Sequence, residues 1–293
     1  MKRKFGDRKD GVLIRKTDAF HLVMPIIWPN RCDNIVFNSD ILDLTKTMAY
    51  LEKKNAQNSK YKHTIFHVIV AATLKMITLR PKLNYFIANK NMYARNEITA
   101  SFVVKKQFTD DGEEGMVRIH AEKTDTYDTI HNKISEAVIK ERSNADLEST
   151  EKFMDILNKL PRCVVKVLGG FLVFLDKHGR VPQSITETDP YYASVIFTNV
   201  GSIQIPNGYH HLTNWGTTSF FITVGGITKR PYFHDDGKYN LRDTIELGLT
   251  FDERIFDGYY FSRSLKMMNT FIENPELLEL PFSEETENGE PVS

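Results

Sequence analysis

Residues 247–278, LGLTFDERIFDGYYFSRSLKMMNTFIENPELL, contain two different hydrophobic periods on either side of a short polar turn. Across residues 244–251, apolar side chains alternate with polar or small ones, which predicts a strand with one buried face. After Asp257-Gly258, apolar side chains recur at three- and four-residue spacing, which predicts an amphipathic helix. Pro275 ends that helix because a proline supplies no amide hydrogen to the next turn. A half-buried strand that leads straight into such a helix must pack within layers of sheet and helix.

Upstream, a strand and two helices are predicted before residue 80. The sequence NIVFN, residues 34–38, is typical of a short strand. Asp40 is a suitable N-cap for a helix that runs from residue 41 to about residue 54. Residues 62–79 predict a strongly apolar helix, which Pro81 ends because the residue before a proline disfavours helical geometry.

The middle of the chain is predicted to contain a hairpin and two helical stretches. Residues 92–108 and 115–122 are predicted strands that pair around the DDGEEG turn. Residues 126–142 predict an amphipathic helix with apolar side chains on one face. Residues 147–175 predict a second helical block, broken at Pro161.

Two more strands are predicted at residues 194–197 and 219–224. Strands and helices mix without a regular strand–helix–strand repeat, which favours an α+β sandwich over a doubly wound sheet. We expect one domain at residues 12–280. A flexible basic N-terminus at residues 1–11 precedes it, and a disordered acidic tail at residues 281–293 follows it.

The composition excludes several classes of function. The 293 residues include 38 Lys and Arg against 38 Asp and Glu, so no global field attracts a nucleic acid. Cys32 and Cys163 do not make a disulfide framework and suit a reducing compartment, although one disulfide between them stays open. The N-terminus, MKRKFGDRKDG, is basic but lacks the apolar segment of a secretory signal. We therefore expect a cytoplasmic protein.

The most apolar run, CVVKVLGGFLVFL at residues 163–175, does not predict a transmembrane segment. It has about half of the roughly 20 residues that a membrane helix needs, and Lys166 and two glycines interrupt it. A buried helix is the first interpretation. A helix that docks on a membrane surface or on a protein partner is the alternative.

Four segments, in order along the chain, resemble one enzyme family. They are HTIFHVIVAATLKMITLRPKLNYFI, SVIFTNVGSIQ, FFITVGGI, and LTFDERIFDG followed by ENPELL. Together they resemble the catalytic domain of the 2-oxoacid dehydrogenase acyltransferases, whose fold chloramphenicol acetyltransferase shares, over about residues 12–280. The resemblance implies a chloramphenicol acetyltransferase-like sandwich of mixed sheet and helices that assembles as a homotrimer. It also implies transfer of an acyl group between coenzyme A and a thiol, an alcohol or an amine.

The resemblance further implies roles for single residues. In the family, a histidine base takes the proton of the acceptor, and a hydroxyl from the neighbouring subunit stabilises the oxyanion of the tetrahedral intermediate. The resemblance carries the hydroxyl onto Thr198 and the conserved turn of the family onto Asp257 and Gly258. Asp257 would orient the turn through an arginine, for which Arg15 is a candidate, and Gly258 would allow a close backbone turn. The histidine position is occupied by Glu253.

Glu253 is a weak base by its ordinary chemistry. A carboxyl group with a pKa of about 4.3 faces a thiol of about 8.5, and each unit of mismatch is worth about 1.4 kcal/mol. Burial would raise the pKa of Glu253 toward that of a better base, whereas Arg254 would oppose the rise if its side chain approached. The structural alternative is a strand-end charge whose ion pair locks the turn.

Histidines elsewhere are weaker candidates. His210 and His211 lie between the Thr198 strand and the next strand, so either could supply a replacement base, although packing residues of a long loop have the same pattern. His63 and His67 stand four residues apart on the apolar helix without the glutamate of zinc-binding helices, which indicates two partly buried histidines. No spacing of ligands predicts a metal site.

Two functional hypotheses follow. The first is an acyltransferase that uses coenzyme A or acyl-CoA as co-substrate and needs no metal, with Glu253, His210 or His211 as base. The second is a catalytically inactive relative, a pseudoenzyme, that binds coenzyme A, an acyl chain or a protein partner. A purely structural trimer is a third alternative.

Overall fold

A mixed six-stranded sheet organises the protein in the computed structural model, which describes residues 4–57, 59–105, 114–143, 156–284, 286–287 and 290–291. In spatial order its strands are β2 (Ile35–Asp43), β9 (Tyr239–Asp252), β8 (Phe220–Phe233), β7 (Val195–Asn199), β5 (Ile98–Lys105) and β6 (Glu114–Ala121). Strand β7 runs parallel to both of its neighbours, and the other neighbouring pairs are antiparallel. The predicted α+β class is therefore confirmed.

Three helices cover one face of this sheet. They are α3 (Ile65–Leu79), α4 (Tyr127–Ser143) and α8 (Gly258–Glu273), and their apolar side chains join those of the strands in one large core. Helix α3 is the centre of that core, because eleven consecutive residues from His67 to Ile77 are buried. Helix α2 (Thr45–Asn55) flanks α8 at one edge.

The opposite face, which we call the open face, carries the side chains of Phe37, Ile196, Thr198, Phe221 and Thr250. Ile196 and Phe221 belong to a small second apolar cluster, separate from the main core. The loop that joins β7 to β8 crosses this face close to the backbone.

Glycine permits that close approach of the loop to the sheet. A Cβ atom added at Gly248 of β9 would lie 1.9 Å from the carbonyl oxygen of Gly208. One added at Gly225 of β8 would lie 1.9 Å from the carbonyl oxygen of Pro206. The loop therefore rests directly on β8 and β9, where a larger residue would displace it.

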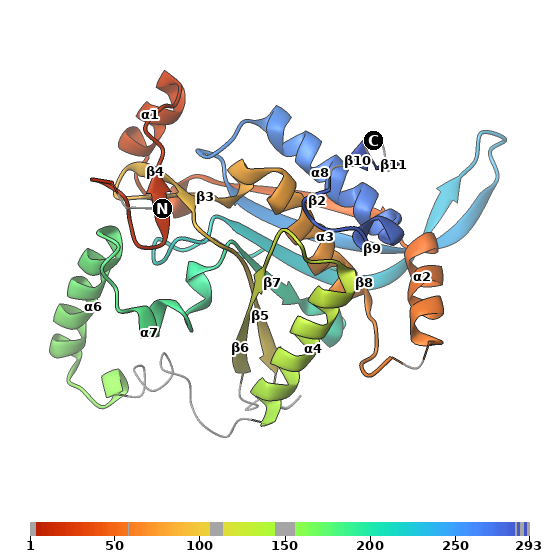
Figure 1. The fold of residues 1–293 in the computed structure, drawn as a ribbon, viewed down its shortest axis with the longest axis horizontal. Coiled ribbons are helices and arrows are strands. Elements are labelled where there is room, and N and C mark those ends of the chain that lie inside the picture. The colour runs from red at the N-terminus through yellow and green to blue at the C-terminus, as the bar shows by residue number, and fades with distance from the viewer. Residues whose placement is uncertain are drawn as a thin grey trace.

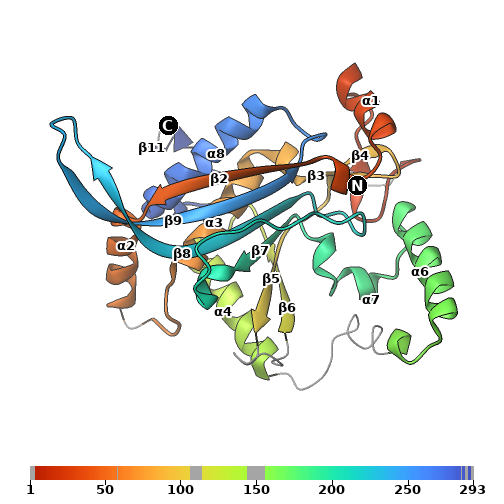
Figure 2. The same cartoon turned by 180° about the vertical axis from the view of Figure 1, so that it is seen from behind.

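Smaller elements extend the two ends of the molecule. A three-stranded sheet combines β1 (Gly11–Leu13), β4 (Asn91–Arg95) and β3 (Tyr85–Ala88). Helices α1 (Ala19–Ile27) and α6 (Arg162–Lys177) lie at one end of the long axis, and the tip of the β8–β9 hairpin lies at the other (Figures 1 and 2). Helix α7 (Gln183–Thr186) follows α6, and the short strands β10 (Thr286–Glu287) and β11 (Glu290–Pro291) pair with each other.

Three sequence predictions of local structure are wrong. The helix predicted from residue 41 begins at Thr45, because Ile41 still pairs with Glu246 and the strand runs on to Asp43. Asp43, and not Asp40, accepts the Thr45 amide, at 2.8 Å. The strand predicted at residues 92–108 is two strands in two different sheets, β4 and β5.

The third error concerns the apolar run at residues 163–175. It forms most of α6, but Asp176 is the helix's buried residue, and six of its large apolar side chains are exposed. The first interpretation, a buried helix, is therefore wrong. Cys163 lies on this helix and, like Cys32, is a free exposed cysteine.

Other predictions hold within a few residues. Helix α3 ends at Leu79, directly before Arg80-Pro81, and α4 matches the predicted helix. Strand β9 contains the strand predicted at residues 244–251, and β7 and β8 each begin one residue after the predicted start; β5 and β6 form the predicted hairpin. Residues 106–113, which hold most of the DDGEEG turn, and residues 147–155 of the predicted helical block lie outside the described residues.

The chain stays packed beyond residue 280. Phe282 is fully buried in the main core, and its amide donates to the carbonyl oxygen of Asp125 at 2.9 Å. Lys75 of α3 is buried and donates to the carbonyl oxygens of Leu277, Leu280 and Pro281. Across the described ranges, no helix has the length and apolarity that a membrane span requires.

Candidate functional site

The turn after β9 presents Glu253 to solvent. Its amide donates to the carbonyl oxygen of Asn34 at 3.1 Å, which fixes the backbone, while its side chain is exposed. Among the described residues, the carboxylate of Glu253 has no ion-pair or hydrogen-bond partner. At the predicted position of the base, the backbone is therefore fixed, and the carboxylate is exposed to solvent.

The neighbours of Glu253, rather than Glu253 itself, lock this turn. Arg254 donates from Nε to Oδ1 of Asp252 at 2.8 Å and from Nη2 to Oδ2 at 2.5 Å, and both side chains are buried. The third donor group, Nη1, reaches the carbonyl oxygen of Trp28 at 2.6 Å. The expected ion pair at the turn therefore exists, but it joins Asp252 to Arg254 and leaves Glu253 free for other contacts.

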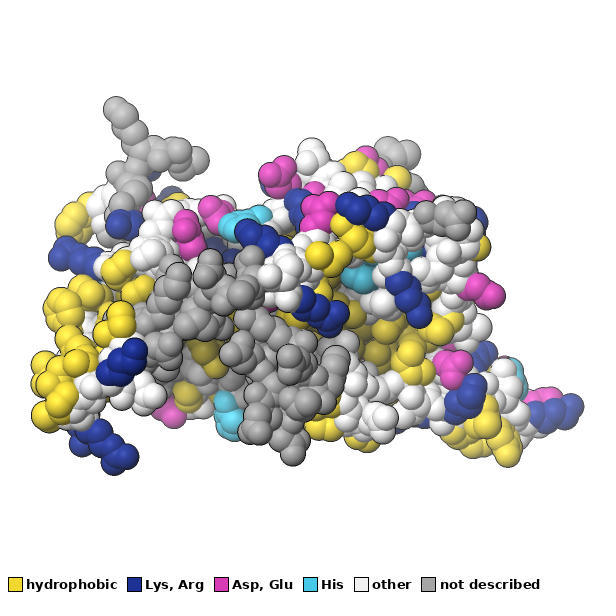
Figure 3. All heavy atoms as spheres, turned by 90° about the horizontal axis from the view of Figure 1, so that it is seen from below, with side chains coloured by type: hydrophobic (Ala, Val, Ile, Leu, Met, Phe, Trp, Pro, Cys, Tyr) yellow, Lys and Arg dark blue, Asp and Glu magenta, His cyan; other side chains and the backbone are white. Residues whose placement is uncertain are grey.

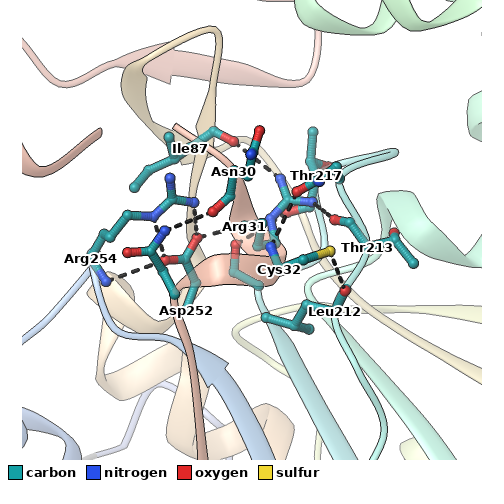
Figure 4. A network of polar contacts seen from close by, with 12 residues as sticks. Asn30, Arg31, Cys32, Ile87, Leu212, Thr213, Thr217, Asp252 and Arg254 are labelled. Atoms are coloured by element: carbon teal, nitrogen blue, oxygen red, sulfur yellow. Dashed lines mark hydrogen bonds and ion pairs between the residues drawn. The ribbon is translucent and has the colours of Figure 1, made fainter. Parts of the chain in front are cut away.

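A second buried arginine connects this turn to the β7–β8 loop (Figure 4). The Nε atom of Arg31 lies 3.9 Å from Oδ2 of Asp252, and its other nitrogens donate to the carbonyl oxygens of Thr213, Gly216 and Ile87. Burial lowers the pKa of Arg31, and the Asp252 carboxylate opposes that shift. One network thus holds the Glu253 turn, the segment before β2 and the β7–β8 loop.

Asp257 and Gly258 have different roles from those expected. Asp257 is the N-cap of α8, where Oδ1 accepts the amide of Tyr260 at 2.7 Å. Arg15 bonds instead to Asp7 and to two backbone carbonyls, so the proposed Arg15–Asp257 contact is wrong. Nothing lies within 4 Å of a Cβ added at Gly258, so no close approach requires a glycine there.

Thr198 lies half-buried on the open face, near the end of β7. It pairs with Thr223 of β8, which pairs with Gly248 of β9. Glu253 is five residues beyond Gly248, which corresponds to about 16 Å along the strand and about 10 Å across two strand spacings. Thr198 and Glu253 of one chain therefore do not reach the same reacting atom.

Both predicted histidines lie on the open face, and His210 is much nearer to Thr198 than Glu253 is. His210 stacks on Phe221 with ring centroids 4.6 Å apart, and His211 meets the edge of Phe37 at 5.7 Å. Phe221 is the diagonal neighbour of Thr198 on this face, a separation on the order of 7 Å. Desolvation and the neighbouring His211 lower the pKa of His210, so its imidazole is neutral at pH 7 and can accept a proton.

A cavity of about 490 Å³ opens at the β5–β6 side of the molecule. Its lining includes Thr99 of β5, Arg118 and His120 of β6, Arg95 of β4, and Tyr192, which lies just before β7. Arg95 donates to the carbonyl oxygens of Tyr192 and Thr217 and to the Thr217 hydroxyl, and burial lowers its pKa to about 9. It stays cationic at neutral pH beside Asp10, and Glu97 and Glu187 line the same cavity, so the wall carries charges of both signs, with Arg95 as a buried cation that can face an anionic group.

Three histidines form a separate buried cluster under α4. His131 stacks on His63 with ring centroids 3.8 Å apart and meets the edge of His67 at 4.6 Å. His67 closes the capping box of α3 with Thr64. His63 and His67, predicted to be partly buried, are both buried in the structure. Within the described ranges, no group of three or more His, Cys, Asp or Glu side chains is arranged to hold a metal ion.

The family pattern and the fold both match known acyltransferases. Residues 183–280, which contain Thr198, His210, His211, Glu253, Asp257 and Gly258, match the family model of the 2-oxoacid dehydrogenases acyltransferase (catalytic domain). No curated protein matches the chain. The resemblance seen in the sequence is therefore confirmed by the family pattern over the C-terminal part of the chain.

Solved structures extend the agreement over almost the whole chain. A probable dihydrolipoamide acetyltransferase from Listeria monocytogenes is 18% identical, with a TM-score of 0.58, covering 92% of this chain and 96% of that one. The dihydrolipoamide acetyltransferase of Azotobacter vinelandii is 16% identical, with a TM-score of 0.57, covering 92% and 95%. A chloramphenicol acetyltransferase is 11% identical, with a TM-score of 0.52, covering 87% and 96%. The chain has the fold of these acyltransferases.

The sequence missed two parts of this site. Asp252 and Arg254 flank Glu253, and the alternation of β9 puts Asp252 on the face opposite the core, where a buried carboxylate needs a cation. That signal was in the sequence. The roles of Arg31 and Arg95 were not visible, because their partners are backbone carbonyls far away along the chain.

Proposed function

We propose that this protein transfers an acyl group between coenzyme A and a thiol, alcohol or amine acceptor, as a homotrimer whose sites lie between subunits. The observation that carries the proposal is the separation of Glu253 from Thr198 within one chain, together with the exposure of Glu253 on a rigid turn. A residue whose backbone is held in place, and whose carboxylate contacts no partner among the described residues, is placed to act on a neighbouring chain. In the Azotobacter relative, a serine, a histidine and an asparagine were investigated for their role in the catalytic mechanism.

Thr198 has the role of the hydroxyl donor in this proposal. It lies half-buried on the open face, and its hydroxyl has no partner among the described residues. A hydroxyl in this position can donate to the oxyanion that forms when the acceptor attacks the thioester. Arg95, a buried cation in the wall of the cavity at the β5–β6 side, can face an anionic group of coenzyme A or of the acceptor.

The base is Glu253 from the neighbouring subunit in the first version of this proposal. Contact with that subunit would desolvate the carboxylate, and removal of water from a carboxylate strengthens it as a base. The second version assigns the base to His210, which shares the open face with Thr198 and has a neutral imidazole at pH 7. The alternative function, a relative that binds coenzyme A without catalysis, requires neither residue to act.

Release of free coenzyme A from acetyl-CoA, measured against a panel of thiol, alcohol and amine acceptors, tests the proposal. If Glu253 is the base, Glu253→Gln lowers the rate by a factor on the order of 100 to 10,000, and His210→Gln leaves it nearly unchanged. If His210 is the base, His210→Gln lowers the rate by that factor and Glu253→Gln leaves it nearly unchanged. Glu276→Gln, an exposed carboxylate on the segment after α8, is the matched control.

The same assay identifies an inactive relative. That alternative predicts no acceptor-dependent release by the wild-type protein and a gain of turnover in Glu253→His, because the histidine restores an ordinary base to an intact channel. A wild-type protein that turns over, and loses activity when Glu253 becomes histidine, uses the glutamate itself.

A further inference from the structure

Helix α6 carries the most exposed apolar surface among the described helices of comparable length, and its orientation is fixed. Asp176 is buried and anchors the helix, since Oδ1 accepts the hydroxyl of Tyr192 at 2.7 Å and Oδ2 accepts the amide of Gly216 at 3.2 Å. Arg8 donates to the carbonyl oxygen of Asp176 at 2.8 Å. The side of α6 that faces the protein is therefore set by strong polar contacts.

The opposite side of α6 is apolar and exposed. At about 100° per residue, Val167, Phe171 and Phe174 point roughly 140–180° away from Asp176. Their exposed fractions are 73%, 57% and 54%. Aromatic and branched apolar side chains held outward by a fixed helix are not the surface of a protein that meets only water.

Cations border this apolar side and exposed anions are absent from it. Within residues 159–180, Lys159, Arg162, Lys166, Lys177 and Arg180 are all exposed. None of the five forms an ion pair with a described residue, and the segment's one carboxylate is the buried Asp176. On the helix itself the three cations fall along one rim, next to the apolar side.

We propose that α6 docks on an anionic lipid surface, with Val167, Phe171 and Phe174 in the acyl–headgroup boundary and the Lys and Arg rim on lipid phosphates and carboxylates. An exposed apolar helix side bordered by Lys and Arg is the pattern of helices that lie in the plane of a membrane interface. Within residues 159–180 the exposed charged side chains are all Lys or Arg, and their positive charge complements an anionic headgroup layer. A protein partner with an acidic rim is the competing occupant that the test below distinguishes.

The location of α6 permits such contact. It lies at one end of the long axis, with α1 at the same end and the β8–β9 hairpin tip at the other (Figures 1 and 2). Seen from below, apolar side chains gather at that end with Lys and Arg side chains beside them (Figure 3). Helix α1 adds the exposed Phe20 to this end, and its C-cap Trp28, also exposed, has an aromatic ring with a polar N–H that suits a headgroup layer.

Co-sedimentation of the full chain with vesicles tests the proposal. We expect binding to vesicles of phosphatidylcholine mixed with phosphatidylserine, weak binding to phosphatidylcholine alone, and a loss of binding as salt screens the charges. The double variant Phe171→Ser/Phe174→Ser should lower the partition coefficient at least tenfold. Lys166→Glu should lower it by about fivefold or more on the mixed vesicles only, since each cation near the surface contributes about that factor.

Matched controls separate docking from general surface effects. Phe233→Ser removes a ring that is 67% exposed at the far hairpin, and Lys53→Glu reverses an exposed charge on α2, so neither should change vesicle binding. Equal binding to both kinds of vesicle, or equal losses in the control variants, overturns the proposal. The proposal is also overturned if, in sedimentation without vesicles, the Phe171→Ser/Phe174→Ser variant has a lower oligomeric state than wild type. That result would show that a second copy of the chain covers α6.

Discussion

The carboxylate of Asp252 and the guanidinium of Arg254 form a two-point ion pair that is closed to solvent, with exposed side-chain fractions of 0% and 1%. The pair lies on either side of Glu253 in sequence and holds the turn that presents it. Breaking one partner of a buried pair leaves an uncompensated charge in the interior.

Asp252→Asn should therefore lower the free energy of unfolding by about 3–5 kcal/mol, because it removes the counter-charge of Arg254 and Arg31 together. Urea denaturation followed by circular dichroism measures the change. Glu253→Gln, one residue away but exposed and without an ion-pair partner among the described residues, should stay within about 0.5 kcal/mol of wild type. Equal losses in the two variants would show that the turn does not depend on the Asp252 pair.

A mixed oligomer should distinguish a site shared between subunits from a site within one chain. Glu253→Gln and Thr198→Val should each abolish most turnover alone, with the Thr198 hydroxyl contributing a factor on the order of 100 to 1,000. Co-expression of the two variant chains should restore part of the activity, because some interfaces then combine an intact Glu253 with an intact Thr198. Activity that stays absent in mixed oligomers would place both groups in one chain or exclude Glu253.

The buried histidine cluster should make the protein less stable as the pH falls below about 6.5. Burial, followed by mutual repulsion, lowers the pKa of His67 to about 3 and of His131 to about 4, and desolvation also lowers the pKa of His63. In the unfolded chain these groups bind protons near pH 6.5, so the unfolded state gains protons first and is favoured as the pH falls toward 4. The stability that the neutral histidines contribute is fully present above pH 6.5.

His131→Phe should reduce that dependence by about one proton, or about 1.4 kcal/mol per pH unit, across the window from pH 6.5 to 5. Among the described residues, the Nδ1 atom of His131 has no hydrogen-bond partner. The substitution therefore replaces the ring contacts with His63, His67, Tyr61 and Tyr127, and a hydrogen bond with the Tyr61 backbone. Thermal unfolding at closely spaced pH values measures the slope. Lys54 and Asp128 lie beside the cluster, where Asp128 raises the pKa of His131 and Lys54 lowers it. The unfolding temperature of the variant is therefore compared with that of wild type at the same pH. An unchanged slope would show that the cluster does not control the acid response.

Gly170→Ala should stabilise the protein by about 0.8–1.0 kcal/mol, since Gly170 lies inside α6 and nothing occupies the space of an added Cβ. Gly248→Ala is the contrasting variant, because its Cβ would lie 1.9 Å from the Gly208 carbonyl oxygen. It should destabilise the fold and displace the β7–β8 loop from β9. The midpoints of urea unfolding compare the two, and a Gly248→Ala protein as stable as wild type would contradict the close contact.

The sequence predicted those elements whose signals are local. The end of α3 at Leu79 depends on Arg80-Pro81, and α4 depends on a simple apolar period. The helix start at residue 41 was missed because Ile41 pairs with β9, a strand about two hundred residues later in the chain, and that pairing overrides local preference. The same limit applies to α6, since apolar composition indicates burial but does not reveal whether another element covers the helix.

The candidate site was predictable in outline but not in its connections. The segment around Glu253 and the hydroxyl of Thr198 followed from the resemblance, and both fall inside the family match. The contact of Asp257 was predicted wrongly, because an aspartate before a helix caps that helix more readily than it seeks a distant arginine. The arginine at the turn is Arg254. It is two residues from Asp252 in sequence, and two hydrogen bonds join their side chains.

Calorimetric titration of the purified protein with coenzyme A and acetyl-CoA tests the central claim most directly. Saturable binding at submillimolar concentration is the predicted result, with weaker binding when Arg95 is changed to leucine and with Glu253→Gln unchanged in affinity. No heat of binding at millimolar coenzyme A would contradict the account, and Glu253 would then be an ordinary charge at the end of a strand.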